Sequence, residues 1–268
     1  MPASARLLKS LRFVLLLLCV VNLRGDSLRS VRSLAADAAF PASLPRTVLW
    51  AWEEPEDLRG IDPAKIGVAY LAESLRLSTT VTVLPRYQPL WLKTGTPVMA
   101  VVRIEPGRGF VDSPALRVAT ADALAVAARQ PGIRAFQVDF DAARSQREFY
   151  RAVLQRLRAE MPAQMPLSIT ALLSWCAGDD WIAGLPIEEA VPMYFRLGVR
   201  RPLSAAKDGW RIHEPLCGTS VGVSTDESWP AVSPGQRVYV FAPRPWTAPQ
   251  LATISGTPAS SPKEEMVP

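Results

Sequence analysis

The sequence contains few of the residues from which many active sites are built. It has one histidine, His213, and three cysteines among 268 residues. This scarcity argues against zinc sites built on histidine and HExxH proteases, and largely against Ser-His-Asp hydrolases. The sequence also lacks GxxxxGK[ST], GxGxxG, CxxC and GxSxG motifs, so no cofactor or phosphate-binding loop is expected. His213 lies in a loop and is interpreted as a surface or packing residue.

The charge distribution does not favour a nucleic-acid-binding domain. The net charge is +5, but seven of the 30 Lys and Arg residues and only two of the 25 Asp and Glu residues lie within residues 1–46. Residues 47–268 therefore carry 23 of each sign, whereas binding to phosphate backbones calls for a basic patch. With 49% hydrophobic and 21% charged residues, the chain has the composition of a globular protein.

The N-terminus has the layout of an export signal. Three basic residues precede a short apolar run at 13–21, which is shorter than the ~20 residues of a confident membrane span. We therefore predict a signal peptide or N-terminal membrane anchor at 1–21 and a linker at 22–46. The domain is expected outside the cytoplasm, in the periplasm or anchored to the inner membrane, because positive charges keep the N-terminal end inside.

Short apolar runs of parallel-sheet character recur from residue 47 onward. They span 48–52, 66–71, 98–105, 133–141, 167–174, 190–196, 220–226 and 237–242. Two helices are expected between them, one capped by Ser113 with Pro114 in its first turn and one following Ser145. An extra strand is expected at 80–84, and a short helix at 179–184.

Eight strands alternating with helices predict an α/β fold, a (β/α)8 TIM-like barrel with an incomplete outer ring of helices. The barrel should occupy 47–246 without a final helix, and 247–268 should be a disordered tail. An open doubly wound sheet is the alternative. That fold usually has a glycine-rich loop after its first strand, and no glycine follows Trp52 here until Gly60.

The fourth strand places two carboxylates on one face. Period two puts Gln137, Asp139 and Asp141 on the side opposite Phe136 and Phe140. The aromatic face should pack on helices, so the carboxylates should point into the barrel mouth, ~6–7 Å apart along the strand. At that spacing their pKa values should be pushed apart, which suits an acid paired with a stabilising carboxylate. Helix capping or loop bracing is the structural alternative.

Other polar and aromatic residues follow the predicted strand ends, where barrel enzymes hold their sites. Arg103 could pair with Asp139 across neighbouring strands or serve a purely structural salt bridge. Glu105 and Asp226 are further candidates for the catalytic acid. The candidate ligand-binding residues are Trp50, Trp52, Glu53, Arg103, Trp175, Tyr194, Arg196, Glu227 and Trp246. Carboxylates and tryptophans at one end of a barrel suit a sugar.

Two further possibilities remain open at this stage. Mg²⁺ or Ca²⁺ could bind Asp139, Asp141 and Glu105, although no metal is the main expectation. Cys176 and Cys217 could form a disulfide in an oxidising compartment. Topology argues against that bond, because one cysteine follows a predicted strand and the other precedes one, which places them at opposite ends of a barrel.

Five stretches of the sequence resemble an uncharacterised bacterial family, domain of unknown function 3142. They lie at 47–53, 136–142, 167–176, 189–198 and 222–227. The family implies no activity. The end of the fourth strand also resembles the D-x-D-x-E array of family-18-type glycosidase barrels. The final glutamate of that array is replaced here by Ala143, so its substrate-assisted mechanism is unsupported, and the acid would have to be Glu105, Asp226 or Glu227.

Two hypotheses follow. The first is a carbohydrate-active barrel of the cell envelope, most simply a glycoside hydrolase, in which Asp139 and Asp141 stabilise or position the reacting sugar and Asp226 or Glu105 acts as the acid. The second is a non-catalytic envelope protein that uses the same mouth to bind a glycan or a partner. No nucleic-acid partner is expected, membrane contact is expected only through an uncleaved N-terminal segment, and the oligomeric state is left open.

Overall fold

A computed structural model describes residues 43–179, 181–197 and 211–256. The predicted signal or anchor, most of the linker and the last twelve residues lie outside the described residues. Among the described residues, no helix is long and apolar enough to cross a membrane.

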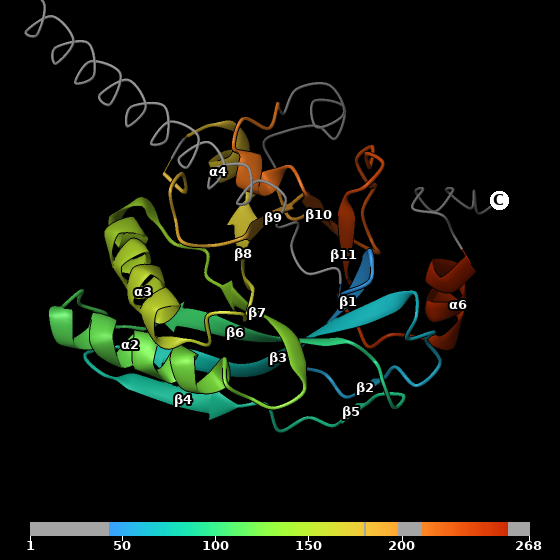
Figure 1. Cartoon of the computed structure of the whole chain (residues 1–268), viewed down its shortest axis with the longest axis horizontal. Coiled ribbons are helices and arrows are strands. Elements are labelled where there is room, and N and C mark those ends of the chain that lie inside the picture. Colours follow the sequence, from blue (N-terminus) through green and yellow to red (C-terminus); the bar gives the residue numbers. More distant parts are fainter. Residues whose placement is uncertain (1–42, 180, 198–210, 257–268) are drawn as a thin grey trace, which may run out of the picture. The chain divides into compact units, whose positions relative to one another are not determined.

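Eight parallel strands close into a barrel (Figure 1). They are β1 (Thr47–Ala51), β3 (Ile66–Leu77), β6 (Val98–Pro106), β7 (Ile133–Asp139), β8 (Leu167–Leu172), β9 (Glu189–Met193), β10 (Ser220–Ser224) and β11 (Arg237–Phe241). The ring closes because β1 pairs with both β3 and β11. The predicted TIM-like barrel is therefore confirmed, and the open sheet is excluded.

Alternation along the strands separates an inner from an outer core. Val48, Trp50, Met99, Val101 and Tyr239 belong to one buried cluster inside the barrel. The opposite strand faces are covered by a larger cluster that includes α2 (Pro114–Ala127) and α3 (Arg147–Glu160). The Ser113 hydroxyl accepts a hydrogen bond from the backbone N–H of Leu116 at 3.2 Å, so the predicted cap of the first helix is confirmed.

The outer ring of helices is thin, as predicted. Besides α2 and α3, the described residues form only α4 (Leu173–Ala177), α6 (Ala248–Gly256) and the short 3-10 turns η1 (Arg144–Gln146) and η2 (Pro215–Cys217). The segment between β3 and β6 holds two strands, β4 (Val81–Pro85) and β5 (Leu90–Trp91). β4 pairs antiparallel with the second half of β3, which confirms the predicted extra strand, and β5 pairs with β2 (Glu56–Asp57).

Two local predictions are wrong. Helix α6 stands where the disordered tail was expected to begin. Thr247 and Gln250 form a reciprocal cap, since the backbone N–H of Thr247 donates to Gln250 Oε1 at 3.0 Å and that of Gln250 to Thr247 Oγ1 at 3.5 Å. Leu251 is buried against the outer core. The second error concerns 179–184, because the short helix comes earlier, directly after β8, where the chain leaves the sheet at Leu172.

Candidate functional site

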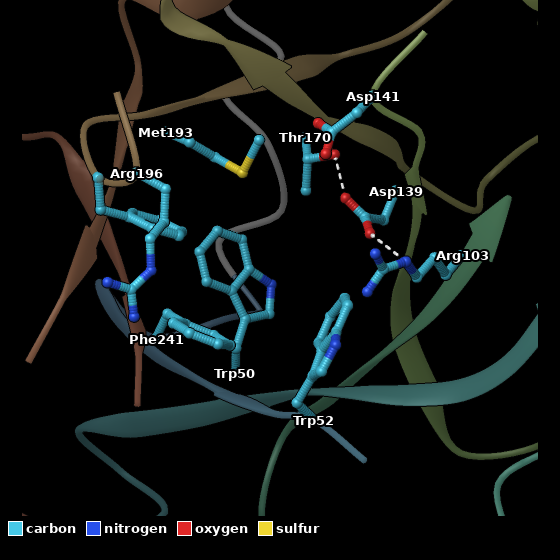
Figure 2. A pocket seen from close by; sticks show the side chains of 10 residues that line it. Trp50, Trp52, Arg103, Asp139, Asp141, Thr170, Met193, Arg196 and Phe241 are labelled. Atoms are coloured by element: carbon cyan, nitrogen blue, oxygen red, sulfur yellow. Dashed lines mark hydrogen bonds and ion pairs between the residues drawn. The ribbon is translucent and has the colours of Figure 1, made fainter. Parts of the chain in front are cut away.

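A cavity of about 250 Å³ opens at the carboxyl ends of the strands (Figure 2). Its polar wall comes from β6, β7 and β8 and its apolar wall from the segments at β1, β9 and β11. The lining residues are Trp50, Trp52, Arg103, Asp139, Asp141, Thr170, Met193, Phe195, Arg196 and Phe241. Six of the thirteen residues proposed from the sequence are therefore brought together around one space.

Asp139 is the best-shielded ionisable group of the cavity, with 9% of its surface exposed. Its Oδ1 accepts a hydrogen bond from Thr170 Oγ1 at 2.6 Å, and its Oδ2 lies 3.8 Å from Arg103 Nε. Arg103 and Asp139 are partners in the register of β6 and β7, as the sequence indicated. Arg103 Nε also lies 3.3 Å from Glu105 Oε1, so Glu105 shares this guanidinium.

Burial raises the pKa of Asp139 to about 6, and the negative charges of Asp141 and Glu105 act in the same direction. The hydrogen bond from Thr170 and the charge of Arg103 oppose the increase but do not cancel it. Burial also raises the pKa of Asp141, against the effect of Arg103. Asp139 can therefore carry a proton near neutral pH, which is what a general acid requires.

The stability of the protein should reflect this shift. The ordinary pKa of an aspartate is 3.8, and in the folded protein that of Asp139 is about 6. Between these two values the folded chain binds more protons than the unfolded chain, so the free energy of unfolding falls as pH rises. We expect Asp139→Asn to gain about 2 kcal/mol of unfolding free energy relative to wild type between pH 4 and pH 7. Urea denaturation at each pH measures the difference.

Asp226→Asn provides a control of opposite sign. The Ser224 hydroxyl bonded to Asp226 lowers the pKa of that carboxyl, and Arg196 contributes. The variant should therefore lose stability relative to wild type as pH rises through the acidic range. A stability difference between wild type and Asp139→Asn that stays flat across this range would show that the carboxyl of Asp139 is not shielded.

The apolar wall consists of stacked and edge-on rings. Phe195 and Phe241 stack with centroids 5.5 Å apart, and Phe241 meets the edge of Trp52 at 6.3 Å. Trp50 stacks on Tyr239 at 5.3 Å. The Arg103 guanidinium lies 5.7 Å from the ring of Trp52, so this cation links the polar wall to the aromatic wall.

Trp52 lies just beyond β1, on a loop that is held by a residue the sequence did not single out. Arg86, which follows β4, donates from its guanidinium to the carbonyl oxygens of Trp52 and Glu54, the second at 2.6 Å. Its Nε donates to the carbonyl of Gln88 at 2.9 Å. The extra strand thus positions the loop that carries Trp52.

Gly222 makes room for Trp50 inside the barrel. A Cβ at this position would lie 3.1 Å from Cη2 of Trp50 and 3.3 Å from the carbonyl oxygen of Pro192. We expect Gly222→Ala to displace the indole and to lower the unfolding free energy by about 1–3 kcal/mol. Gly60→Ala is the control, because its Cβ would meet only Leu251 at 3.9 Å. Thermal unfolding of the two variants tests this, and equal melting temperatures would refute it.

Arg196 stands at the rim of the cavity in a left-handed backbone conformation, with φ of 57°. Glu227 accepts its backbone N–H at 3.1 Å and its Nη1 at 3.2 Å, and Asp226 accepts Nη2 at 3.0 Å. A non-glycine residue in this region costs free energy and persists only where neighbouring contacts fix it. Asp226 and Glu227 therefore hold Arg196 and do not themselves line the cavity.

Four other residues proposed from the sequence lie away from the cavity. Trp175 is on α4 in the outer core, 4.8 Å from the ring of Trp181, because β8 ends before it. Tyr194 packs against the outer core because Met193 and Phe195 face the cavity, and alternation along the chain turns the residue between them outward. Trp246 is buried outside the barrel and donates from Nε1 to the carbonyl of Trp50 at 3.0 Å. Glu53 is exposed.

The residues that the sequence analysis missed are Thr170, Met193, Phe195 and Phe241. Thr170 and Phe241 lie on the inner faces of β8 and β11, so alternation within those strands could have identified both. No group of three or more His, Cys, Asp or Glu side chains that could hold a metal ion occurs among residues 43–179, 181–197 and 211–256. The structure thus gives the Mg²⁺ or Ca²⁺ alternative no support.

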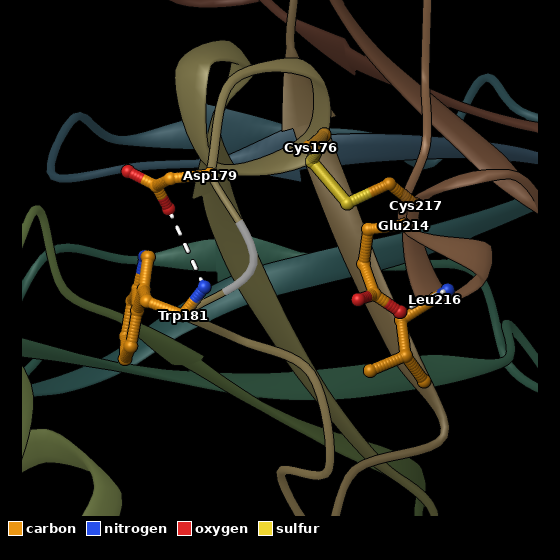
Figure 3. The surroundings of a disulfide bond; sticks show 6 residues. All are labelled: Cys176, Asp179, Trp181, Glu214, Leu216 and Cys217. Carbon is orange, nitrogen blue, oxygen red and sulfur yellow. Dashed lines mark hydrogen bonds between the residues drawn. A yellow bond between two sulfur atoms is a disulfide. The ribbon is translucent and has the colours of Figure 1, made fainter.

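Cys176 and Cys217 form a disulfide, with Cα atoms 5.8 Å apart (Figure 3). The argument from topology was therefore wrong, for two reasons. Helix α4 begins directly after β8, so Cys176 does not continue along the direction of the strand. The strands are also staggered, since Met193 at the end of β9 pairs with both Leu172 and Gly222, so β10 begins level with the middle of β8.

His213 is exposed, as expected, and its backbone N–H donates to the carbonyl of Cys176 at 2.9 Å. The disulfide and this hydrogen bond fix the end of the connection between β9 and β10. That connection leaves β9 next to Arg196, at the rim of the cavity.

Two solved structures are similar to part of this chain. The chitinase domain of the spore coat protein CotE from Clostridium difficile is 13% identical, with 58% of this chain and 51% of that chain covered and a TM-score of 0.39. The Bacillus cereus spore cortex-lytic enzyme SleL is 17% identical, with 73% and 55% covered and a TM-score of 0.46. The chain thus spans little more than half the length of these solved structures. No curated protein matches it.

Residues 94–188 match the model of a family described as "Domain of unknown function (DUF3142)". The matched segment runs from the loop before β6 to the residue before β9 and contains Arg103, Asp139, Asp141 and Thr170. The resemblance seen in the sequence is therefore confirmed over this segment, which carries the polar wall of the cavity and matches domain of unknown function 3142.

Proposed function

We propose that this barrel binds a sugar residue in the cavity and hydrolyses its glycosidic bond. The observation that carries the proposal is the meeting of two carboxylates, Asp139 and Asp141, with the rings of Trp50 and Trp52 around one space. Aromatic faces suit the C–H face of a pyranose, and the polar wall suits its hydroxyl groups. A pair of carboxyl groups is the usual catalytic equipment for this reaction.

In this proposal Asp139 is the general acid. Its raised pKa keeps a proton available, and that proton passes to the glycosidic oxygen as the bond to the anomeric carbon breaks. Asp141 is more exposed and acts on the anomeric carbon, either directly as nucleophile or by taking a proton from the attacking water. The anomer released first, observed by NMR, distinguishes retention from inversion.

Arg103 and Thr170 support the acid. Thr170 fixes one oxygen of Asp139, and Arg103 stabilises the carboxylate that remains after proton transfer. Because Glu105 pairs with the same guanidinium, we assign it to orienting Arg103 in place of the acid role considered from the sequence. Asp226 is likewise removed from that role, since its pKa is lowered by Ser224 and it pairs with Arg196.

One observation favours a second function, the binding of a glycan without hydrolysis. In the D-x-D-x-E array that the fourth strand resembles, the third acidic position is occupied here by Ala143. The cavity consequently has two carboxylates among its lining residues. A receptor on the same barrel would need the aromatic wall but not the raised pKa of Asp139.

A glycan array followed by product analysis separates these functions. The purified protein is expected to retain a glycan, and incubation for a day should release new reducing ends. Trp52→Ala should weaken binding more than about ten-fold, because the ring offers a large apolar contact. Trp91→Ala is the matched control, since Trp91 is exposed on β5 and does not line the cavity. Retention without release would favour the receptor, and the absence of retention would refute both functions.

We further propose that the domain works outside the cytoplasm. The support is the disulfide between Cys176 and Cys217, because such bonds persist in oxidising compartments. The basic and apolar N-terminal segment of the sequence points the same way. Fractionation of the producing cell, with thiol labelling of each fraction, would show the oxidised protein in the envelope. A wholly cytoplasmic, reduced protein would contradict this proposal.

A further inference from the structure

A chain of buried polar side chains crosses the barrel interior from β11 to β1. Its centre is Glu189, the first residue of β9, whose side chain has no exposed surface. Its Oε2 accepts from Ser168 Oγ at 3.0 Å and from Tyr239 Oη at 2.7 Å, and Arg237 Nη1 lies 3.2 Å from its Oε1. Gln137 Nε2 donates to Ser168 Oγ at 3.1 Å, and Trp50 Nε1 donates to Gln137 Oε1 at 3.0 Å.

These hydrogen bonds have one direction, which the carboxylate imposes. An ionised Glu189 can only accept hydrogen bonds, so the hydroxyl of Ser168 donates its single hydrogen to it. The Ser168 oxygen must then receive its other hydrogen bond from the amide nitrogen of Gln137. This leaves the amide oxygen of Gln137 as the acceptor for the indole N–H of Trp50.

Both supports of the Trp50 ring lead to the same carboxylate. The indole N–H is held through Gln137 and Ser168, and the indole face stacks on Tyr239, whose hydroxyl donates to Glu189. Trp50 in turn lines the cavity beside Trp52. Without the Ser168 hydroxyl, the amide N–H of Gln137 loses its acceptor. A buried donor without a partner carries a free-energy cost, so the Gln137 amide is expected to turn and to withdraw its oxygen from the Trp50 indole.

We propose that Glu189 is a positioning residue that sets the orientation of Trp50 in the cavity and thereby the affinity for the bound sugar ring. The statement about orientation stands independently of any ligand. The statement about affinity rests on the proposed function.

The orientation is tested by NMR of the eight tryptophan indole N–H groups in the full chain. Trp50→Phe assigns the resonance of interest, because its peak is then missing. Ser168→Ala interrupts the series of hydrogen bonds between Glu189 and Trp50. It leaves the contacts of Glu189 with Arg237 and Tyr239 in place. We expect the Trp50 resonance to shift and its hydrogen exchange to speed up about ten-fold, with the other indoles unchanged.

Ser220→Ala is the matched control. It removes the same atom from β10, and the buried Ser220 hydroxyl has no hydrogen-bond partner among the described residues. The Trp50 resonance should not move. Glu189→Gln keeps the side-chain size, and it should reproduce the change seen in Ser168→Ala if it folds. An unchanged Trp50 resonance in Ser168→Ala would overturn the proposal.

The ligand measurement distinguishes failure of this proposal from failure of the proposed function. For a glycan that the wild type retains, Ser168→Ala should raise the Kd about ten-fold, and Ser220→Ala should not. A moved Trp50 resonance with unchanged Kd would overturn the role in affinity. If the wild type retains no glycan, the proposed function fails, while the NMR result still decides whether Glu189 positions Trp50.

Discussion

Asp139→Asn is expected to lower kcat/KM for glycoside hydrolysis by about 10²–10⁴-fold, the usual contribution of a general acid. Asparagine keeps the shape of the side chain and an oxygen for the hydrogen bond from Thr170, but it has no proton to transfer. In the wild type the rate should fall as pH rises above about 6, because Asp139 loses its proton there. Initial rates of reducing-end release between pH 4 and pH 8 measure both effects.

Asp226→Asn is the control for this prediction. Asp226 is a carboxylate of the same barrel end that binds Arg196 and does not line the cavity. Its replacement should lower kcat/KM far less, and the rate should still decrease above about pH 6. Wild-type activity in Asp139→Asn would refute the acid role of Asp139, and a greater loss in Asp226→Asn would return that role to Asp226, one of the candidates from the sequence.

Removal of the disulfide is expected to cost about 4 kcal/mol of unfolding free energy, because 41 positions separate Cys176 from Cys217 and the bond restricts the unfolded chain. For a domain of this size the loss corresponds to a melting temperature lower by about 8–16 °C. Calorimetry of the Cys176→Ser, Cys217→Ser double variant beside the oxidised wild type measures it.

Reductant provides the control for the disulfide. It should lower the melting temperature of the wild type toward that of the double variant and leave the double variant unchanged. Equal melting temperatures of the oxidised wild type and the double variant would mean that the bond contributes nothing to the stability of the domain.

The sequence predicted the features that depend on local periodicity. Apolar runs gave the eight strands, and alternation within β7 put Asp139 and Asp141 on the inner face, away from Phe136 and Phe140. The pairing of Arg103 with Asp139 also followed, because neighbouring parallel strands carry their inner residues at matching heights. Such features need only the pleat of a strand and the order of the strands.

The features that the sequence did not predict depend on where a strand ends and how strands are staggered. Trp175 lies away from the cavity because β8 ends at Leu172 and helix α4 begins. Tyr194 points outward because the inner residues of this segment are Val191, Met193 and Phe195, so the face predicted for Tyr194 from the sequence is wrong. The disulfide depends on the offset of β10 against β9. The series of hydrogen bonds from Glu189 through Ser168 and Gln137 to Trp50 joins residues from four strands and leaves no local pattern in the sequence.

The most direct test of the account is a crystal structure of Asp139→Asn bound to a glycan that the wild-type protein cleaves. The account predicts a sugar ring in the cavity against Trp50 and Trp52, with its glycosidic oxygen within about 3.2 Å of the side chain at position 139. A glycan bound elsewhere on the protein, with this cavity empty, would contradict it.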